Sequence, residues 1–172
     1  MEGGMPGDIL SRARRVKLVL TDCDGVLTDA GVYYSERGEE LKRFNIRDGM
    51  GVERLRNLAG IDTGIVTGEM SPSVVRRAEK LGIVECHLGV KDKAGKIREI
   101  LERRKITGDE LAYIGDDVND LSAFAMVGLT ACPHDADLSV RAVAHVILER
   151  PGGHGAFREL AEMILQACLE KA

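Results

Sequence analysis

The 172-residue chain has no tryptophan, and only 3% of its residues are aromatic. Its core must therefore be aliphatic, and a surface that stacks the bases of single-stranded nucleic acid is disfavoured. Basic charge is also scarce, since 24 Lys and Arg are outnumbered by 28 Asp and Glu. The short basic run at residues 12–15 is expected to be a solvated helix face. Neither nucleic acid nor an anionic membrane surface is expected to be a partner.

Paired cysteines and long apolar runs are absent as well. The four cysteines form no Cys-x-x-Cys motif, and nothing at the start of the chain resembles a signal peptide. These features predict reduced thiols and a cytoplasmic protein. No apolar run approaches the ~20 residues needed to span a bilayer. The length is sufficient for one domain with its own core, which we expect over residues 8–172.

Short apolar segments alternate with helical patterns along the chain. The predicted strands cover residues 16–21, 62–66, 85–88, 111–114, 129–131 and 145–148. The predicted helices cover residues 49–59, 72–81, 93–105, 120–127, 138–144 and 156–169. Ser71 before Pro72 and the Thr107-x-x-Glu110 capping box mark two helix starts. This alternation predicts an α/β fold: a doubly wound, Rossmann-like parallel sheet flanked by helices.

Two segments fall outside this alternation. Residues 31–44 contain two extended arms around a turn in which Gly38 can supply a positive φ, which predicts an inserted β-hairpin. A lone hairpin is marginally stable in water, so we expect Tyr33, Leu41 and Phe44 to pack on something else. Residues 150–155 carry three glycines around His154. We expect this flexible tail to close over a site, and specifically over that of a neighbouring subunit.

Polar residues gather where the predicted strands end. In open α/β sheets, ligands bind beyond the carboxyl ends of the strands. The residues at those ends are Asp22, Asp24, Thr67, Gly68, Lys93, Gly115, Asp116, Asp117, Asn119 and Asp120. Carboxylates suit a hard divalent cation, whereas a lysine and a hydroxyl suit anionic oxygens. The set therefore predicts a phosphate-handling site.

Physical chemistry divides the work among these residues. Mg²⁺ prefers oxygen ligands, for which we assign the Asp22 and Asp116 carboxylates and the main-chain carbonyl of Asp24. Asp22 is the expected nucleophile and would form an aspartyl-phosphate, because the metal and Lys93 offset its repulsion from the phosphate. Asp24 would protonate the leaving alcohol and later deprotonate the attacking water. Thr67 and Gly68 are expected to bind phosphate.

The remaining carboxylates and lysines leave alternatives open. Asp117, Asn119 and Asp120 are expected to orient the metal-binding groups without coordinating the ion. Asp120 could instead be a helix cap. Lys91 is the competitor of Lys93 for the phosphate.

Four motifs in order carry a family resemblance: Asp22-Cys23-Asp24-Gly25-Val26, Thr67-Gly68, Lys93, and the run from Gly115 to Asp120. They resemble the motifs of the haloacid dehalogenase superfamily of phosphatases. No gap between them could hold a cap domain. The capless layout, with "NIRDGMG" and "GGHGAFRE", is similar to the 3-deoxy-octulosonate 8-phosphate phosphatase family. That resemblance implies a sugar-acid phosphatase of surface-glycan biosynthesis. It also implies a homotetramer in which hairpins pack together and a neighbouring subunit helps cover the site.

The second motif departs from the octulosonate pattern, which generally continues as Thr-Gly-Arg. This chain has Glu69 after Thr67-Gly68, followed by Arg77 and Lys80. The combination resembles the branch that acts on 3-deoxy-nonulosonate 9-phosphate. We therefore expect Glu69, Arg77 and Lys80 to bind the distal end of the substrate and to favour a nine-carbon acid.

Two non-enzymatic functions are alternatives for a chain with these motifs. A phospho-receiver domain also clusters Asp, Thr and Lys on a doubly wound sheet, but its phosphate-accepting Asp would follow the third strand, which here ends in "CHLGV". A regulatory domain of the same fold would be expected to have lost some catalytic residues. All of them are present in this chain.

Overall fold

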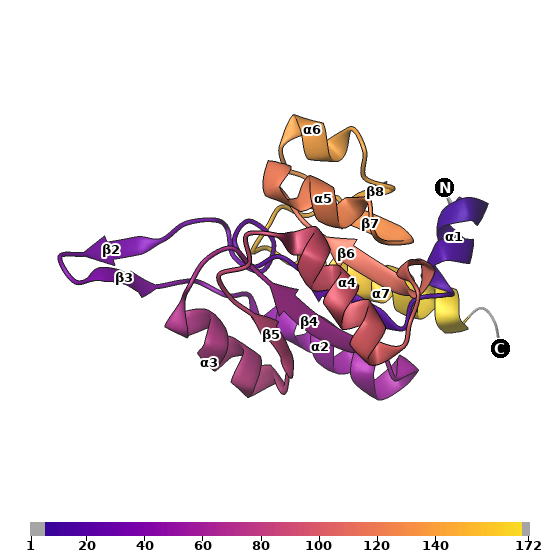
Figure 1. Cartoon of the computed structure of the whole chain (residues 1–172), viewed down its shortest axis with the longest axis horizontal. Helices are drawn as coiled ribbons and strands as arrows, with labels where there is room; N and C mark the ends of the chain where they lie inside the picture. Colours follow the sequence, from indigo (N-terminus) through magenta and orange to yellow (C-terminus); the bar gives the residue numbers. More distant parts are fainter. Residues whose placement is uncertain (1–5, 170–172) are drawn as a thin grey trace.

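The structure, a computed structural model, describes residues 6–169 (Figure 1). Its centre is a six-stranded sheet in the order β5-β4-β1-β6-β7-β8, and every pairing in it is parallel. The strands are β1 (Leu18–Thr21), β4 (Asp62–Val66), β5 (Glu85–His87), β6 (Leu111–Ile114), β7 (Leu129–Cys132) and β8 (Val146–Ile147). The predicted doubly wound α/β fold without a cap domain is confirmed.

Helices cover both faces of the sheet because successive strand side chains point to opposite sides. Val19 faces one core, whereas Leu18 and Leu20 face the other. The first core lies under α1 (Gly7–Ala13), α2 (Ile46–Ala59), α3 (Pro72–Leu81) and α7 (Ala156–Leu169). The second lies under α4 (Lys93–Arg104), α5 (Leu121–Phe124) and α6 (Leu138–Arg141). Single 3-10 turns occur at Gly108–Glu110 and Val118–Asp120.

Most element bounds differ from the sequence-based ones by a few residues. The bounds of β4, β6, α3 and α7 agree with the prediction. Helix α2 begins at Ile46, earlier than predicted, because the Asn45 side chain caps it by accepting from the Arg47 amide at 2.9 Å. The predicted capping box of Thr107 and Glu110 is present, although it opens a 3-10 turn.

The basic run at residues 12–15 lies at the end of a helix, α1, as expected, but it is solvated only in part: Arg12 and Arg14 are half-buried, and Arg15 is exposed. Arg12 Nη1 donates to the carbonyl of Gly128 at 2.5 Å, and Arg14 Nε donates to that of Ala167 at 3.1 Å. These bonds attach α1 to α7 and to the segment before β7. Residues 170–172 of the expected domain lie outside the described residues. Between residues 6 and 169, no helix is long and apolar enough to cross a membrane.

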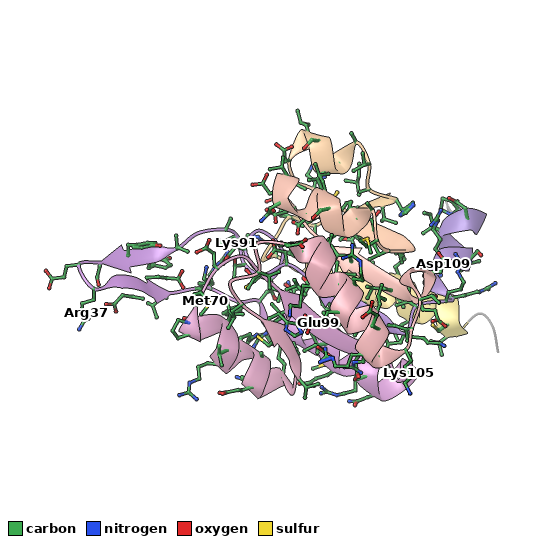
Figure 2. The ribbon with its side chains drawn as sticks, viewed as in Figure 1. Arg37, Met70, Lys91, Glu99, Lys105 and Asp109 are labelled. Carbon is green, nitrogen blue, oxygen red and sulfur yellow. The ribbon has the colours of Figure 1, made fainter. Side chains whose placement is uncertain are left out.

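The predicted hairpin is formed by β2 (Tyr33–Ser35) and β3 (Gly38–Leu41) and projects from the sheet (Figure 1). Arg37 lies at its tip (Figure 2). Tyr33 and Leu41 are 62% and 63% exposed, whereas Phe44 packs against the core of its own chain. Packing of the exposed pair against another subunit stays a prediction.

The glycine-rich segment at 150–155 packs on the loop that follows β1. The Gly153 amide donates to the Val26 carbonyl at 2.9 Å. A Cβ on Gly152 would lie 1.9 Å from the Gly25 carbonyl oxygen, so this close approach requires glycine. The segment therefore contacts a loop of its own chain, and its movement over a neighbouring site stays a prediction.

Candidate active site

The predicted site lies at the carboxyl ends of the central strands. The chain leaves β1 for β4 and β5 on one side and then crosses to β6 on the other, so β1 and β6 form the switch point of the sheet. A cavity of about 210 Å³ opens there. Its lining residues are Asp22, Asp24, Ala30, Thr67, Gly68, Glu69, Asp116, Asp117 and Asn119. Residues that follow β1, β4 and β6 thus share one cavity.

Strand β1 fixes the position of Asp22. The Asp22 amide donates to the carbonyl of Ile114 at 3.0 Å, which extends the β1–β6 pairing by one residue. The Cys23 amide donates to Asp22 Oδ1 at 2.6 Å. Gly25 then turns the backbone with a φ of +79°, and a Cβ there would lie 1.9 Å from Asp116 Oδ2. The turn therefore brings the β1 loop into contact with the carboxylate that follows β6.

Lys93 lies between two carboxylates at the start of α4. Its Nζ is 2.6 Å from Asp22 Oδ2 and 2.6 Å from Asp120 Oδ1, and its side chain is only 1% exposed. Lys91 instead donates to the Gly68 carbonyl at 3.1 Å. The structure thus brings Lys93, and not Lys91, to Asp22.

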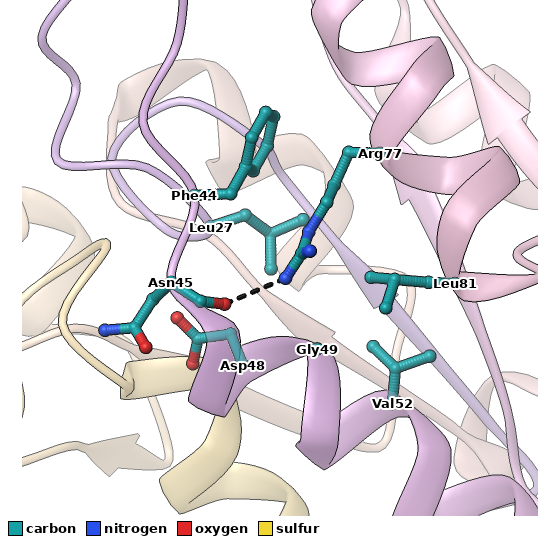
Figure 3. Close-up of a pocket in the computed structure, with 8 residues that line it drawn as sticks. All are labelled: Leu27, Phe44, Asn45, Asp48, Gly49, Val52, Arg77 and Leu81. Atoms are coloured by element: carbon teal, nitrogen blue, oxygen red, sulfur yellow. Dashed lines mark hydrogen bonds between the residues drawn. The ribbon is translucent and has the colours of Figure 1, made fainter.

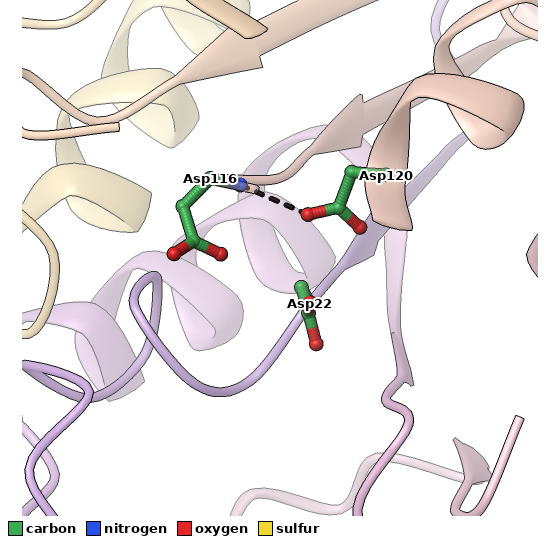
Figure 4. A group of neighbouring side chains, drawn as sticks. All are labelled: Asp22, Asp116 and Asp120. Carbon is green, nitrogen blue, oxygen red and sulfur yellow. Dashed lines mark hydrogen bonds between the residues drawn. The ribbon is translucent and has the colours of Figure 1, made fainter. Parts of the chain in front are cut away.

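Three carboxylates lie close together at this point (Figure 4). Asp22, Asp116 and Asp120 each offer an oxygen within 4.8 Å of the others. Asp116 Oδ1 is buried and has no hydrogen-bond partner among the described residues. Clustered carboxylate oxygens with an unused acceptor form a donor set that fits a hard divalent cation. The cluster could therefore hold a metal ion.

Asp120 has little capacity left for such an ion. Its Oδ1 accepts from Lys93 and from the Tyr113 hydroxyl, which is 2.7 Å away. Its Oδ2 accepts from the amides of Asp116 at 2.9 Å and Asp117 at 3.3 Å. It therefore closes the capping box at Val118–Asp120 and also contacts Lys93 and the Asp116 loop. At the start of α5 its side chain makes no capping hydrogen bond, so its capping contact belongs to the 3-10 turn, and its orienting role stays a prediction.

The cluster carries more negative charge than Lys93 can balance. Burial, followed by the charge of Asp120, raises the pKa of Asp22 to about 6, against the opposing effect of Lys93. Burial and the charges of Asp22 and Asp120 raise the pKa of Asp116 to about 8. Burial alone would lower the pKa of Lys93, but these carboxylates raise it on balance. Lys93 therefore stays charged, and a bound cation would relieve the remaining repulsion.

Asp24 is held by a residue that the sequence did not identify. Lys42 Nζ, one residue beyond β3, lies 2.6 Å from Asp24 Oδ1. Asp24 Oδ2 is buried and has no hydrogen-bond partner among the described residues. The charged run at 39–43 is typical of a solvated strand, so nothing in the pattern marked Lys42 as buried. Tyr113 was overlooked for a similar reason, because its strand was predicted only as core.

The second motif contributes backbone and hydroxyl groups. Thr67 is buried, and its amide extends the β4–β5 pairing by donating to His87 at 3.0 Å. Thr67, Gly68 and Asn119 line the same cavity as Asp22. Asp117 also lines it, while its side chain accepts from the Val118 amide at 2.7 Å. These positions allow contact with a phosphate bound beside Asp22.

The three expected specificity residues are not together within this chain. Glu69 lines the catalytic cavity. Arg77 instead donates to the Asn45 carbonyl at 2.9 Å and lies over the Phe44 ring, 5.7 Å from its centroid (Figure 3). Lys80 lines a separate groove with Arg77 and Phe44. Arg77 and Lys80 thus do not line the cavity that holds Asp22, and their contact with substrate stays a prediction.

Comparison with known proteins agrees with this geometry. Residues 30–128 match the haloacid dehalogenase-like hydrolase family. A 3-deoxy-D-manno-octulosonate 8-phosphate phosphatase of Haemophilus influenzae is 40% identical over 156 residues, which is 91% of this chain and 86% of the relative. The chain belongs to this phosphatase family of haloacid dehalogenase-like hydrolases. It is therefore a phosphoric monoester hydrolase, as the motifs predicted, and neither non-enzymatic alternative is supported.

Solved structures of family members have the same fold. The Yersinia pestis 3-deoxy-D-manno-octulosonate 8-phosphate phosphatase superposes with a TM-score of 0.93 at 37% identity, covering 96% of this chain and 89% of that one. The enzyme of that name from Moraxella catarrhalis was solved with a magnesium ion, a phosphate ion and a KDO molecule. It has a TM-score of 0.91 at 36% identity and covers 95% of this chain and 93% of that one.

Proposed function

We propose that this phosphatase requires Mg²⁺ and hydrolyses the terminal phosphate of a 3-deoxy-2-ulosonic sugar acid through an aspartyl-phosphate. One observation carries the proposal. Asp22 contacts Lys93 at the end of a buried strand, and it shares a cavity with Asp24 and Asp116, whose Oδ2 and Oδ1 atoms have no hydrogen-bond partner among the described residues. This arrangement combines a nucleophile, a cation, a proton carrier and a metal ligand within one cavity.

In the first step the Asp22 carboxylate attacks phosphorus, and the bond between phosphorus and the sugar oxygen breaks. Asp24 Oδ2 donates a proton to that oxygen, so the sugar leaves as a neutral alcohol. In the second step Asp24 removes a proton from water. The resulting hydroxide attacks phosphorus, and the bond between phosphorus and the Asp22 oxygen breaks, which releases inorganic phosphate and restores the Asp22 carboxylate.

The charge of the cavity must be offset before a carboxylate can approach a phosphate dianion. Lys93 supplies one fixed positive charge 2.6 Å from Asp22. A magnesium ion held by Asp22, Asp116 and the Asp24 main-chain carbonyl would supply the rest by neutralising phosphoryl oxygens. Thr67 and the backbone at Gly68 would bind those oxygens, and Asp120 would keep Lys93 and Asp116 oriented.

The relatives' names make 3-deoxy-D-manno-octulosonate 8-phosphate the first candidate substrate. Glu69 supports a second candidate, 3-deoxy-nonulosonate 9-phosphate. An exposed carboxylate on the cavity accepts hydrogen bonds only from hydroxyl or amino groups. The longer polyol chain of a nine-carbon acid offers one more hydroxyl group to such an acceptor.

We also propose that the enzyme is a homotetramer in the cytoplasm. The exposed Tyr33 and Leu41 support packing of the hairpins between subunits. In that assembly Arg77 and Lys80 would bind the substrate carboxylate in the site of an adjacent subunit. Light scattering that reported a stable, fully active monomer would contradict the tetramer and the contact of Arg77 and Lys80 with an adjacent site. The four cysteines are all free thiols, which is compatible with a reducing compartment.

The test is an assay of purified protein with Mg²⁺ against eight- and nine-carbon keto-acid phosphates. We expect kcat/KM to be highest for one of these acids among a panel that includes simple sugar phosphates. Substitution Glu69→Ala is expected to lower kcat/KM more for the nine-carbon than for the eight-carbon substrate. Equal efficiency on both acids, unchanged by the substitution, would remove Glu69 from substrate selection. Failure to hydrolyse either acid would refute the proposed substrate class.

A further inference from the structure

Two consecutive residues at the end of the hairpin bind the loop that follows β1. Lys42 Nζ lies 2.6 Å from Asp24 Oδ1, and Arg43 Nη2 lies 2.6 Å from Asp29 Oδ2. The two contacts differ in environment. The Lys42 side chain is 1% exposed, whereas that of Arg43 is 56% exposed. Lys42 is thus a buried cation directed at the proton carrier of the proposed mechanism.

Lys42 also contacts a second carboxylate, that of Glu39 in the hairpin. Its Nζ lies 3.4 Å from Glu39 Oε2, and Glu39 Oε1 accepts from the Ser71 hydroxyl at the start of α3. Asp24 also receives a weaker contact from the Thr28 hydroxyl, 3.4 Å from Oδ1. The lysine is therefore fixed between two carboxylates, one of which is attached to a helix. Such a side chain loses little further freedom when it orients its partner.

The contact with Lys42 distinguishes the two carboxylate oxygens of Asp24. Lys42 and Thr28 both approach Oδ1, whereas Oδ2 is buried and has no partner among the described residues. Among the described residues, Oδ2 is therefore the oxygen of Asp24 that is left without a hydrogen bond, and we assign the transferred proton to it.

We propose that Lys42 is a positioning residue that holds the Asp24 carboxylate for proton transfer. This inference rests on the proposed role of Asp24 as general acid and base. It assigns to the hairpin a catalytic purpose in addition to any subunit contact. Loss of Lys42 leaves Asp24 in place but free to rotate.

The leaving group of the substrate separates positioning from general stabilisation. A sugar alkoxide must be protonated as it leaves, whereas p-nitrophenolate leaves as a stable anion and hardly depends on an acid. The value of kcat/KM includes steps only up to the first irreversible one, which is departure of the leaving group. A defect in Asp24 orientation must therefore appear in kcat/KM for the sugar phosphate and much less for p-nitrophenyl phosphate.

The experiment compares Lys42→Met with Arg43→Met in the full-length enzyme with Mg²⁺. Both changes remove one ion pair between the same hairpin and the same loop, but only the first pair involves Asp24. General acid catalysis contributes about 100-fold or more, so Lys42→Met is expected to lower kcat/KM for the sugar phosphate at least tenfold. For p-nitrophenyl phosphate we expect kcat/KM to fall less than about threefold, because that reaction depends little on general acid catalysis. Arg43→Met is expected to leave the ratio of the two kcat/KM values as in wild type.

Three outcomes would overturn the inference. An equal loss on both substrates would make Lys42 a structural anchor, and an altered ratio in Arg43→Met would assign the effect to the hairpin as a whole. Weaker inhibition by inorganic phosphate in Lys42→Met would indicate that Lys42 binds phosphate directly. Circular dichroism and thermal melting check that each variant is folded. A wild-type enzyme inactive on both substrates would instead refute the proposed function, so the two failures are distinguishable.

Discussion

Substitution Gly25→Ala tests whether Asp116 lies where the structure places it. A Cβ at Gly25 would be 1.9 Å from Asp116 Oδ2 and 2.4 Å from its Cγ. Non-bonded heavy atoms need roughly 3.5 Å, so the carboxylate would have to move by on the order of 1–2 Å. The end of this side chain can rotate, so we expect Asp116 to be displaced without unfolding of the loop.

The substitution has two separable costs. At a φ of +79°, an L-residue costs about 1–2 kcal/mol of backbone strain. For a domain of this size, that strain lowers Tm by roughly 2–8 °C. A displacement of about 1 Å at a catalytic centre can reduce the rate by roughly 100-fold. Activity is therefore expected to fall much further than stability.

Gly60→Ala is the matched control for the strain. Gly60 has a φ of +66°, and a Cβ there meets no heavy atom within 4 Å. Its variant should melt at a temperature similar to that of the Gly25 variant and keep at least about half of the wild-type kcat/KM, because no displacement accompanies the strain. Thermal melts, phosphatase assays and Mg²⁺ titrations on both variants make the comparison. If Gly25→Ala kept the activity of Gly60→Ala, the placement of Asp116 against Gly25 would be wrong.

Three further predictions concern the carboxylates. Asp22→Asn is expected to leave a folded protein with less than about a tenth of wild-type turnover, because an amide is a poor nucleophile. Circular dichroism checks the fold and a phosphatase assay the turnover. Higher residual activity would exclude Asp22 as the nucleophile. Added Mg²⁺ is expected to raise Tm more at pH 8 than at about pH 5.5. The pKa values of Asp22 and Asp116 are raised to about 6 and about 8, so without metal the folded protein loses stability as the pH rises toward 8 and these carboxylates ionise. A bound cation restores that stability only at a pH where the carboxylates are ionised. An equal Tm gain at both pH values would contradict this account. Asp120→Asn is expected to lower the free energy of unfolding by about 3 kcal/mol, which is the low end for breaking a buried ion pair. The loss of the contact with Lys93 is offset in part because the substitution also removes the repulsion of Asp120 from Asp22 and Asp116. Urea denaturation that showed no loss would mean that Asp120 does not hold Lys93.

The sequence by itself determined the order of strands and helices and the identity of the residues at the strand ends. Both are local properties. The four buried residues of β1 run directly into Asp22, so the pattern places that carboxylate at the end of a central strand whatever its rotamer. Parallel strands bring their carboxyl ends to one edge, so Thr67 and Asp116 were expected there too. The motif order added the family, which the comparisons confirmed.

Only the tertiary structure decided which side chains meet across long separations. Lys42 is 18 residues from Asp24 in a run that reads as solvated, and its burial depends on how the hairpin folds back over the β1 loop. Arg77 was expected to bind substrate together with Glu69 because the combination resembles the nonulosonate 9-phosphate branch. Helix α3, however, carries Arg77 to Phe44 and Asn45, away from the catalytic cavity. Periodicity specifies the face of an element on which a residue lies, but the neighbour of that face depends on the packing of the whole chain.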